Sequence, residues 1–188
     1  MEDKAGGADN RRELLAGLTG KVVEVGAGTG SNFEHYPATV DEVVAVEPEP
    51  YLREKAREAA ERAPVRVRVV DGEADSLPAE DGEFDAGVAS LVLCSVPDQA
   101  TAMRELHRVI KQGGELRFYE HVAAEGRQGK LHRRIDPVYT RLAGGCHLTR
   151  DTTAAIEQAG FQIQQSRRFP FPPGIFAIPH VLGNARRN

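Results

Sequence analysis

The chain has few cysteines, no tryptophan and no long apolar run. Among its 188 residues there are two cysteines, too few for a disulfide framework, and neither a CxxC pair nor an HExxH pattern is present. No segment approaches the roughly 18 apolar residues of a membrane span, and the opening MEDKAGGADNRR lacks the apolar centre of a signal peptide. We therefore expect no metal site, no membrane anchor and a cytoplasmic location.

Neither sign of charge is in large excess. The net charge is −4, which provides no long-range attraction to nucleic acid, so no nucleic-acid partner is expected. With 40% hydrophobic and 28% charged residues, the composition is that of an ordinary globular protein. A chain of this length fits one domain, which we place at 1–188 with residues 1–10 flexible.

Apolar runs and helical patterns alternate along the chain. The expected strands are 21–25, 43–47, 65–70, 84–90, 115–119 and 161–168. The expected helices are 11–18, 31–36, 51–62, 99–111, 126–143 and 149–159, with Pro137 interrupting the fifth. This alternation with short connections predicts an α/β fold, a parallel sheet with helices on both faces.

A glycine-rich turn, EVGAGTG at 24–30, joins the first strand to the next helix. Such a turn places bare backbone beside a ligand. Dinucleotides favour GxGxxG, but here the third glycine, Gly30, comes one position early and Ser31 follows it. The carboxylate of Glu24 would repel a pyrophosphate, whereas it can organise the loop amides or meet an ammonium group. The turn thus favours S-adenosylmethionine (SAM) over NAD as the cofactor, with S-adenosylhomocysteine (SAH) as the product. The alternative is an ordinary tight turn that binds no cofactor.

Further cofactor residues are expected where the next strands end. Glu47 can accept the two ribose hydroxyls, and Asp71 can accept the exocyclic amine of adenine; for Glu47 the alternative is a plain strand-end acid. Residues 90–96, which follow the fourth strand, are expected to line the space between cofactor and substrate, although 91–93 can instead belong to the core. The full expected cofactor set is Glu24, Gly26, Ala27, Gly28, Gly30, Asn32, Tyr36, Glu47, Pro48, Asp71, Gly72, Glu73, Ala74, Ser90 and Leu91.

The order of these motifs resembles the class I SAM-dependent methyltransferases. The resemblance rests on residues 22–30, Glu47, residues 84–90 and the LHRVIKQGG segment at 106–114, in which Gln112 replaces the usual proline. It implies a Rossmann-like fold with a seven-stranded, mostly parallel sheet.

A closer resemblance, to the methyltransferase-like 7 family, covers most of the chain. It rests on the segments GSNF (30–33), YP (36–37), LVLCSV (91–96), YEHVAAE (119–125), DP (136–137), GCHLTR (145–150) and PH (179–180). The animal members are associated with S-methylation of small alkyl thiols and carry a hydrophobic N-terminal anchor, which this sequence lacks. The resemblance implies a small-molecule acceptor with a thiol, either a metabolite or a natural product.

The catalytic candidates follow the fifth strand. His121 is the expected base, because histidine titrates in the useful range, although it can equally be a structural histidine. Glu120 can orient His121 or contact the substrate. Arg150 can attract a thiolate or carboxylate, or be structural. Cys94 is expected to be a small buried residue rather than a nucleophile.

Other readings of the sequence stay open. The same motifs fit an N-, O- or C-methyltransferase acting on a small molecule, a quinone or a phospholipid headgroup, and they also fit a SAM-binding protein without catalysis. Because about twenty residues precede the first strand, we expect residues 122–150 and 169–188 to cover the substrate side. A second subunit is the alternative cover, and the oligomeric state is left open.

Overall fold

The computed structural model describes residues 7–124, 126–171 and 178–188. The strands are β1 (Gly20–Val25), β2 (Val40–Val46), β3 (Val67–Val70), β4 (Phe84–Ser90), β5 (Ile110–His121), β6 (Phe161–Phe171) and β7 (Ile178–Arg187). The helices are α1 (Gly7–Leu15), η2 (Phe33–His35), α2 (Pro50–Ala60), α3 (Gln99–Val109), α4 (Gly126–Leu142) and α5 (Thr152–Gln158).

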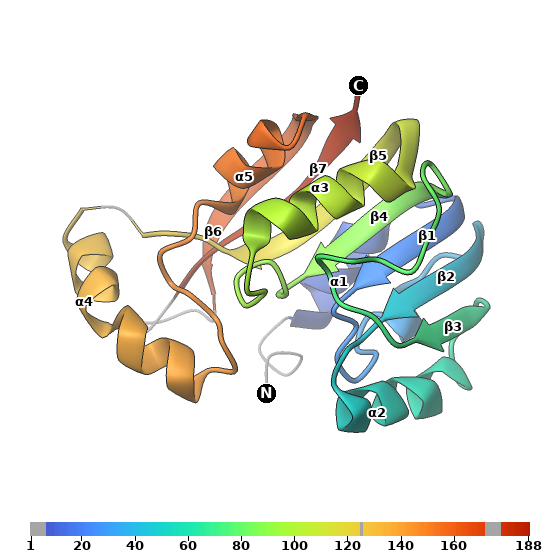
Figure 1. The fold of residues 1–188 in the computed structure, drawn as a ribbon, viewed down its shortest axis with the longest axis horizontal. Helices are drawn as coiled ribbons and strands as arrows, with labels where there is room; N and C mark the ends of the chain where they lie inside the picture. The colour runs from blue at the N-terminus through green and yellow to red at the C-terminus, as the bar shows by residue number, and fades with distance from the viewer. Residues whose placement is uncertain (1–6, 125, 172–177) are drawn as a thin grey trace.

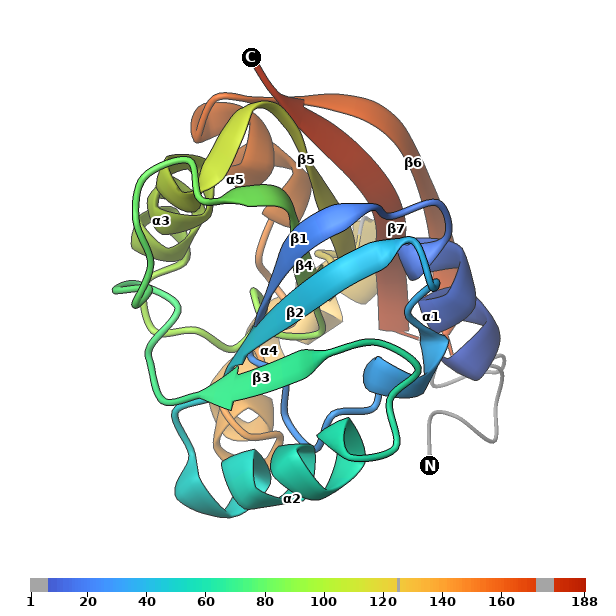
Figure 2. The ribbon, with the colours of Figure 1, turned by 90° about the vertical axis from the view of Figure 1, so that its right-hand side faces the viewer.

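The seven strands form one twisted sheet in the order β3-β2-β1-β4-β5-β7-β6 (Figures 1 and 2). The pairs from β3 to β5 are parallel, and β7 runs antiparallel to both β5 and β6. The expected seven-stranded, mostly parallel sheet is confirmed. The chain order changes direction between β1 and β4, and such a switch point is where open α/β sheets bind ligands beyond the carboxyl ends of their strands.

Both faces of the sheet are covered, which explains the continuous apolar runs of its central strands. One core layer joins α3 and α5 to the sheet, with Met103, Leu106 and Ile156 fully buried. The other layer joins α1 and α2 to the opposite face through Leu14, Leu15 and Ala56. The central strands are therefore held rigidly from both sides, and their carboxyl ends offer a fixed frame for a site.

Several elements differ from the sequence expectations. Only one turn, η2, forms within 31–36, and β3 begins at Val67 rather than at residue 65. Pro137 lies inside a continuous α4 and does not interrupt it. Of the segment expected to be flexible, residues 1–6 lie outside the described residues, whereas α1 begins at Gly7.

The C-terminal segment also differs, since 178–187 is a strand inside the sheet. Residues 169–171 end β6 and residues 178–187 form β7, so these parts of the expected cover 169–188 are strands of the sheet; residues 172–177 lie outside the described part. Helix α4 projects from the body of the sheet, within the expected cover 122–150 (Figure 1). No helix among the described residues has the length and apolar character needed to cross a membrane.

Candidate active site

A pocket of about 350 Å³ opens at the carboxyl ends of the parallel strands. The expected cofactor residues that line it are Gly26, Gly28, Glu47, Pro48, Gly72, Glu73, Ala74 and Leu91. Val92, Ser95 and Val96 also line it, within the segment 90–96 that was expected to lie between cofactor and substrate, and Gly144 lies within the expected cover 122–150. The lining residues that sequence reasoning missed are Leu52, Asp75 and Pro97, each one to four positions beyond an expected residue, so the loops were predicted but not their full extent.

The glycine loop forms one wall of this pocket. Gly26 has φ +62°, and a side chain there would meet Cγ2 of Val92 at 2.2 Å. Gly28 has φ +57°, but the space where its side chain would stand is empty and borders the pocket. A glycine is therefore required at position 26 by packing against Val92, whereas the missing side chain at Gly28 leaves space for a ligand in the pocket.

Glu47 stands at the end of β2, buried and facing the pocket. Its Oε2 accepts a hydrogen bond from the backbone N–H of Gly28 at 2.7 Å, and its Oε1 accepts one from the N–H of Glu49 at 3.1 Å. These two bonds fix the carboxylate, and each oxygen has a further lone pair to accept from a ligand. The arrangement fits a vicinal diol such as the ribose of SAM.

Glu24 lies beneath the loop rather than in the pocket, and it is almost fully buried. Asn32 Nδ2 donates to its Oε1 at 2.9 Å and the Tyr36 hydroxyl donates to its Oε2 at 2.7 Å. Arg11 in turn donates to the amide oxygen of Asn32. Burial raises the pKa of Glu24 to about 7, although these donors oppose the rise. Glu24, Asn32 and Tyr36 thus form a network that supports the loop from below.

Other expected cofactor residues also lie outside the pocket lining. Asp71 pairs with Arg53 at 2.9 Å, its side chain is 73% exposed, and it is not among the lining residues. Ser90 accepts a hydrogen bond from Arg11 at 3.3 Å. Ala27 packs in the core, and Gly30 lies against the ring of Phe33. For Asp71 and Ser90, the side-chain partners lie 18 and 79 positions away in the sequence.

Glu120 holds the loop that follows β4. It is completely buried, and its carboxylate accepts the backbone N–H groups of Val92, Leu93 and Cys94 at 3.0, 2.9 and 3.2 Å. Burial raises its pKa to about 7, against the lowering effect of these donors. Glu120 is therefore not a substrate contact, which corrects one of its two expected roles; it positions the 91–96 loop.

Leu91, at the start of the same loop, is the one non-glycine among the described residues with positive φ, at +58°. A leucine in this region is strained, and such strain persists only where the surroundings impose it. The N–H of Leu91 donates to the carbonyl of Tyr119 at 2.7 Å, and Leu91 lines the pocket. The strained turn carries the chain from the sheet into the pocket wall.

Arg150 serves the same loop from the other side. Its guanidinium donates to the carbonyl of Leu93 at 2.7 Å, and its own carbonyl accepts the N–H of Ala123. The structure thus shows Arg150 bridging two backbone segments, and not facing the pocket lining. Of its two expected roles, the structural one matches these contacts.

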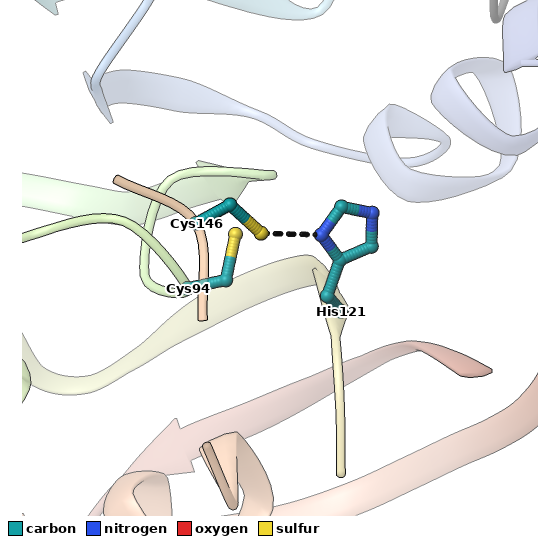
Figure 3. A group of neighbouring side chains, drawn as sticks. All are labelled: Cys94, His121 and Cys146. Carbon is teal, nitrogen blue, oxygen red and sulfur yellow. Dashed lines mark hydrogen bonds between the residues drawn. The ribbon is translucent and has the colours of Figure 1, made fainter. Parts of the chain in front are cut away.

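His121 lies at the end of β5 beside two thiols, Cys94 and Cys146 (Figure 3). Its Nδ1 is 2.9 Å from the sulfur of Cys146, and the ligand atoms of all three residues lie within 4.8 Å of one another. Hydrogen bonding from Cys94, and then from His121, lowers the pKa of Cys146, while the contact with Cys146 and burial raise the pKa of Cys94. Cys146 is the residue here that sequence reasoning overlooked.

The ring of His121 also packs against a second histidine. His180 packs edge-on against it, with centroids 4.4 Å apart, and the ring of Tyr119 lies beyond. His180 is buried, its Nδ1 donates to the carbonyl of Ile178 at 2.8 Å, and burial lowers its pKa to about 4. The expected base therefore sits in a fixed orientation between a neutral imidazole and a thiol.

Comparison with known proteins matches residues 23–118 to the family described as "Methyltransferase domain". The chain is 35% identical to Thiol S-methyltransferase TMT1B from Rattus norvegicus, over 98% of this chain and 79% of that protein. It is also 35% identical to Thiol S-methyltransferase TMT1A from Homo sapiens, over 95% of this chain and 78% of that one. The fold is similar to a solved geranyl diphosphate methyltransferase in complex with SAM, with TM-score 0.79 and 15% identity, covering 98% of this chain and 85% of the other.

Proposed function

The chain belongs to the class I SAM-dependent methyltransferases, and from that premise we propose that it transfers the methyl group to the thiol of a small molecule. The observation that supports a thiol acceptor is how much of the chain is similar to the thiol S-methyltransferases. The family match ends at residue 118, whereas the similarity to the thiol S-methyltransferases extends over 98% of the chain. The likeness thus includes the segments after β5, which cofactor binding alone does not require.

The pocket supports SAM as the methyl donor. Gly28 leaves open space at the wall, the carboxylate of Glu47 is fixed beside it, and the pocket is large enough to take most of a nucleoside. SAM supplies an electrophilic methyl on a sulfonium. In this proposal Glu47 binds the ribose, and the backbone of 72–75 lies along the adenine.

The main contribution of the protein to methyl transfer is to align the methyl donor with the acceptor. The acceptor thiol loses its proton to solvent, its sulfur forms a bond to the methyl carbon as the bond to the sulfonium sulfur breaks, and neutral SAH leaves. Holding the two reactants in line can supply roughly 7–11 kcal/mol of the barrier. A thiol with a pKa of about 8.5 is partly ionised at neutral pH and is a strong nucleophile, so a modest base is enough.

The test is methyl transfer to three acceptors that differ in one atom: benzyl mercaptan, benzylamine and benzyl alcohol. SAH formation is followed with each, and the methylated product is identified by mass. We expect turnover with the thiol and at least tenfold less with the other two. Turnover confined to the amine or the alcohol would refute the thiol proposal and favour an N- or O-methyltransferase.

A binding variant separates catalysis from cofactor binding. Glu47→Gln keeps the size of the side chain but loses a charged acceptor, an effect of about 1.5–3 kcal/mol. We expect SAH affinity to fall roughly tenfold or more in calorimetry. If the wild-type chain binds SAH but methylates none of the three acceptors, a SAM-binding protein without catalysis becomes the better description.

A further inference from the structure

Cys94, His121 and Cys146 bring three metal-binding side chains to one point. They come from the loop after β4, the end of β5 and the loop after α4. Figure 3 shows both sulfurs and the imidazole Nδ1 turned toward one another. The two cysteines are buried and the histidine is half-buried. No spacing in the sequence predicts this group, because consecutive members are 27 and 25 positions apart.

The three segments are tied together by groups outside the cluster. The carbonyl of Cys94 accepts the N–H of His147 at 2.8 Å, which joins the two cysteine-bearing loops. Glu120 fixes the N–H of Cys94, and Asp136 accepts both the N–H of Leu148 and a contact from the His147 ring. Such supporting bonds are what orient metal ligands in known sites.

The distances match a small tetrahedral ion after a minor adjustment. With Zn–S bonds of about 2.3 Å and Zn–N bonds of about 2.1 Å, ligand atoms on a tetrahedron stand about 3.6 to 3.8 Å apart. The three ligand atoms already lie within 4.8 Å of one another, and the 2.9 Å between His121 and Cys146 has to widen by less than ~1 Å. Rotation of the Cys146 side chain provides such a movement.

We infer that Cys94, Cys146 and His121 bind a zinc ion whose fourth position takes the sulfur of the methyl acceptor. Two thiolates and an imidazole are ligands that zinc favours. Three protein ligands leave one position open, which is the pattern of catalytic rather than structural zinc sites. The part of the inference that concerns the acceptor rests on the proposed thiol methylation; the metal site does not.

The cluster lies on loops that also line the pocket, and in this inference its open position is turned toward an acceptor bound there. Ser95, next to Cys94, and Gly144, two residues before Cys146, both line the pocket. An acceptor thiol bound there loses its proton to solvent and binds zinc as a thiolate. Its sulfur then forms the bond to the methyl carbon while the sulfonium bond breaks, and the neutral thioether is a weak ligand that leaves.

Metal content is the first test. The protein is purified from zinc-supplemented medium under a phosphine reductant, and bound metal is measured by elemental mass spectrometry. We expect about one zinc per chain in the wild type, and a loss of roughly tenfold or more in affinity in Cys94→Ser, Cys146→Ser and His121→Gln. His107→Gln is the control. His107 lies on α3, where it packs against Phe161 and is not part of the cluster, so this variant should keep its zinc.

The variants must be shown to be folded for a loss of zinc to be meaningful. Circular dichroism and SAH calorimetry supply that check, and Cys146→Ala provides a second variant if the serine disturbs the core. Replacing zinc by cobalt gives a visible spectrum that depends on the ligands. We expect this spectrum to show thiolate charge-transfer bands and to change on adding benzyl mercaptan but not benzyl alcohol.

Four outcomes would overturn the inference. The first is a reduced wild-type protein that retains no zinc, and the second is equal retention by the cysteine variants. The third is a disulfide bond between Cys94 and Cys146. It would be detected as the loss of two hydrogen atoms in the mass of protein purified without reductant, and it would form again in preference to zinc binding. The fourth is full thiol methylation by chelator-treated, metal-free protein, which would leave the proposed function standing. Zinc binding without any thiol turnover would instead refute the proposed function and leave the metal site in place.

Discussion

Gly17 and Gly28 share a backbone conformation but differ in what surrounds them. Their φ angles are +76° and +57°, and neither would bring a side chain within 4 Å of another atom. Gly28 borders the pocket, whereas Gly17 follows α1 away from it. Gly17→Ala and Gly28→Ala should each lower the free energy of unfolding by about 1–2 kcal/mol, because a side chain disfavours positive φ.

The two variants should separate in cofactor binding. The methyl group in Gly28→Ala enters the space beside Glu47, so we expect SAH affinity to fall roughly tenfold or more, while Gly17→Ala binds normally. Urea unfolding and calorimetry measure the two effects. Equal SAH affinity in both variants would mean that the cofactor does not lie against Gly28.

At this scale, backbone roles were easier to predict than side-chain roles. Gly26, Gly28 and Glu47 line the pocket because a strand end and a turn place them there, and both features are local. Asp71 lies outside the pocket lining and pairs with Arg53 on α2, a contact that no local pattern predicts. The cluster around Cys146 could not be foreseen either, since its three members meet only after distant loops pack together.

Among the elements, α4 is joined to the loop that follows it through Asp136. Its carboxylate accepts the N–H of Leu148 at 2.6 Å, contacts the ring of His147 at 3.0 Å and accepts the hydroxyl of Thr149 at 3.4 Å. Asp136→Ala should lower the free energy of unfolding by about 1–3 kcal/mol, because it leaves a part-buried N–H without its acceptor. It should also loosen the loop that carries Cys146, so that this thiol reacts faster with a disulfide reagent in metal-free protein.

Asp98→Ala is the matched control for that change. Asp98 caps α3 through the N–H of Thr101, a contact whose loss costs about 1 kcal/mol, and it has no part in the Cys146 loop. Unfolding in urea and the rate of thiol modification are measured for both variants. If Asp98→Ala exposes the thiol as much as Asp136→Ala does, the greater reactivity reflects general destabilisation and not release of the loop.

The elements that were predicted well are those with a local signature. The valine-rich runs of β1 and β2 are buried on both faces, and Asp98 marks the start of α3. The final strand was harder, because the GNARR end of β7 is polar and glycine-containing. What makes it a strand is pairing on both sides, with β5 and with β6, which no short-range pattern records.

On the scale of the whole molecule, the order of the strands decides where the site forms. Strand order reverses between β1 and β4, and the pocket opens at that point, drawing on the loops after β1, β2, β3 and β4. The right-handed crossovers of parallel strands make this arrangement predictable from the alternation of elements. Gly144, which follows α4, lines the same pocket from outside that alternation, and no strand–turn pattern predicts its place there.

Global stability should carry a pH signature of the buried Glu24. Its pKa is raised by burial from 4.5 to about 7, so the folded protein holds a proton there that the unfolded chain releases. Between about pH 4.5 and about pH 7 the folded state binds more protons, and stability falls as the pH rises. The loss is complete above about pH 7 and amounts to roughly 3 kcal/mol at most.

The variant Glu24→Gln isolates this effect from opposing ones. Burial lowers the pKa values of His107 and His132, which makes stability rise with pH in an overlapping range, but these groups titrate alike in both proteins. The difference in unfolding free energy, wild type minus variant, should therefore decrease from pH 5 to pH 7 and stay level from pH 7 to pH 8. Cofactor-free protein unfolded in urea at each pH provides the measurement. A difference that stays constant over the whole range would show that Asn32, Tyr36 and Arg11 keep Glu24 ionised throughout, and that burial is not the dominant influence on it.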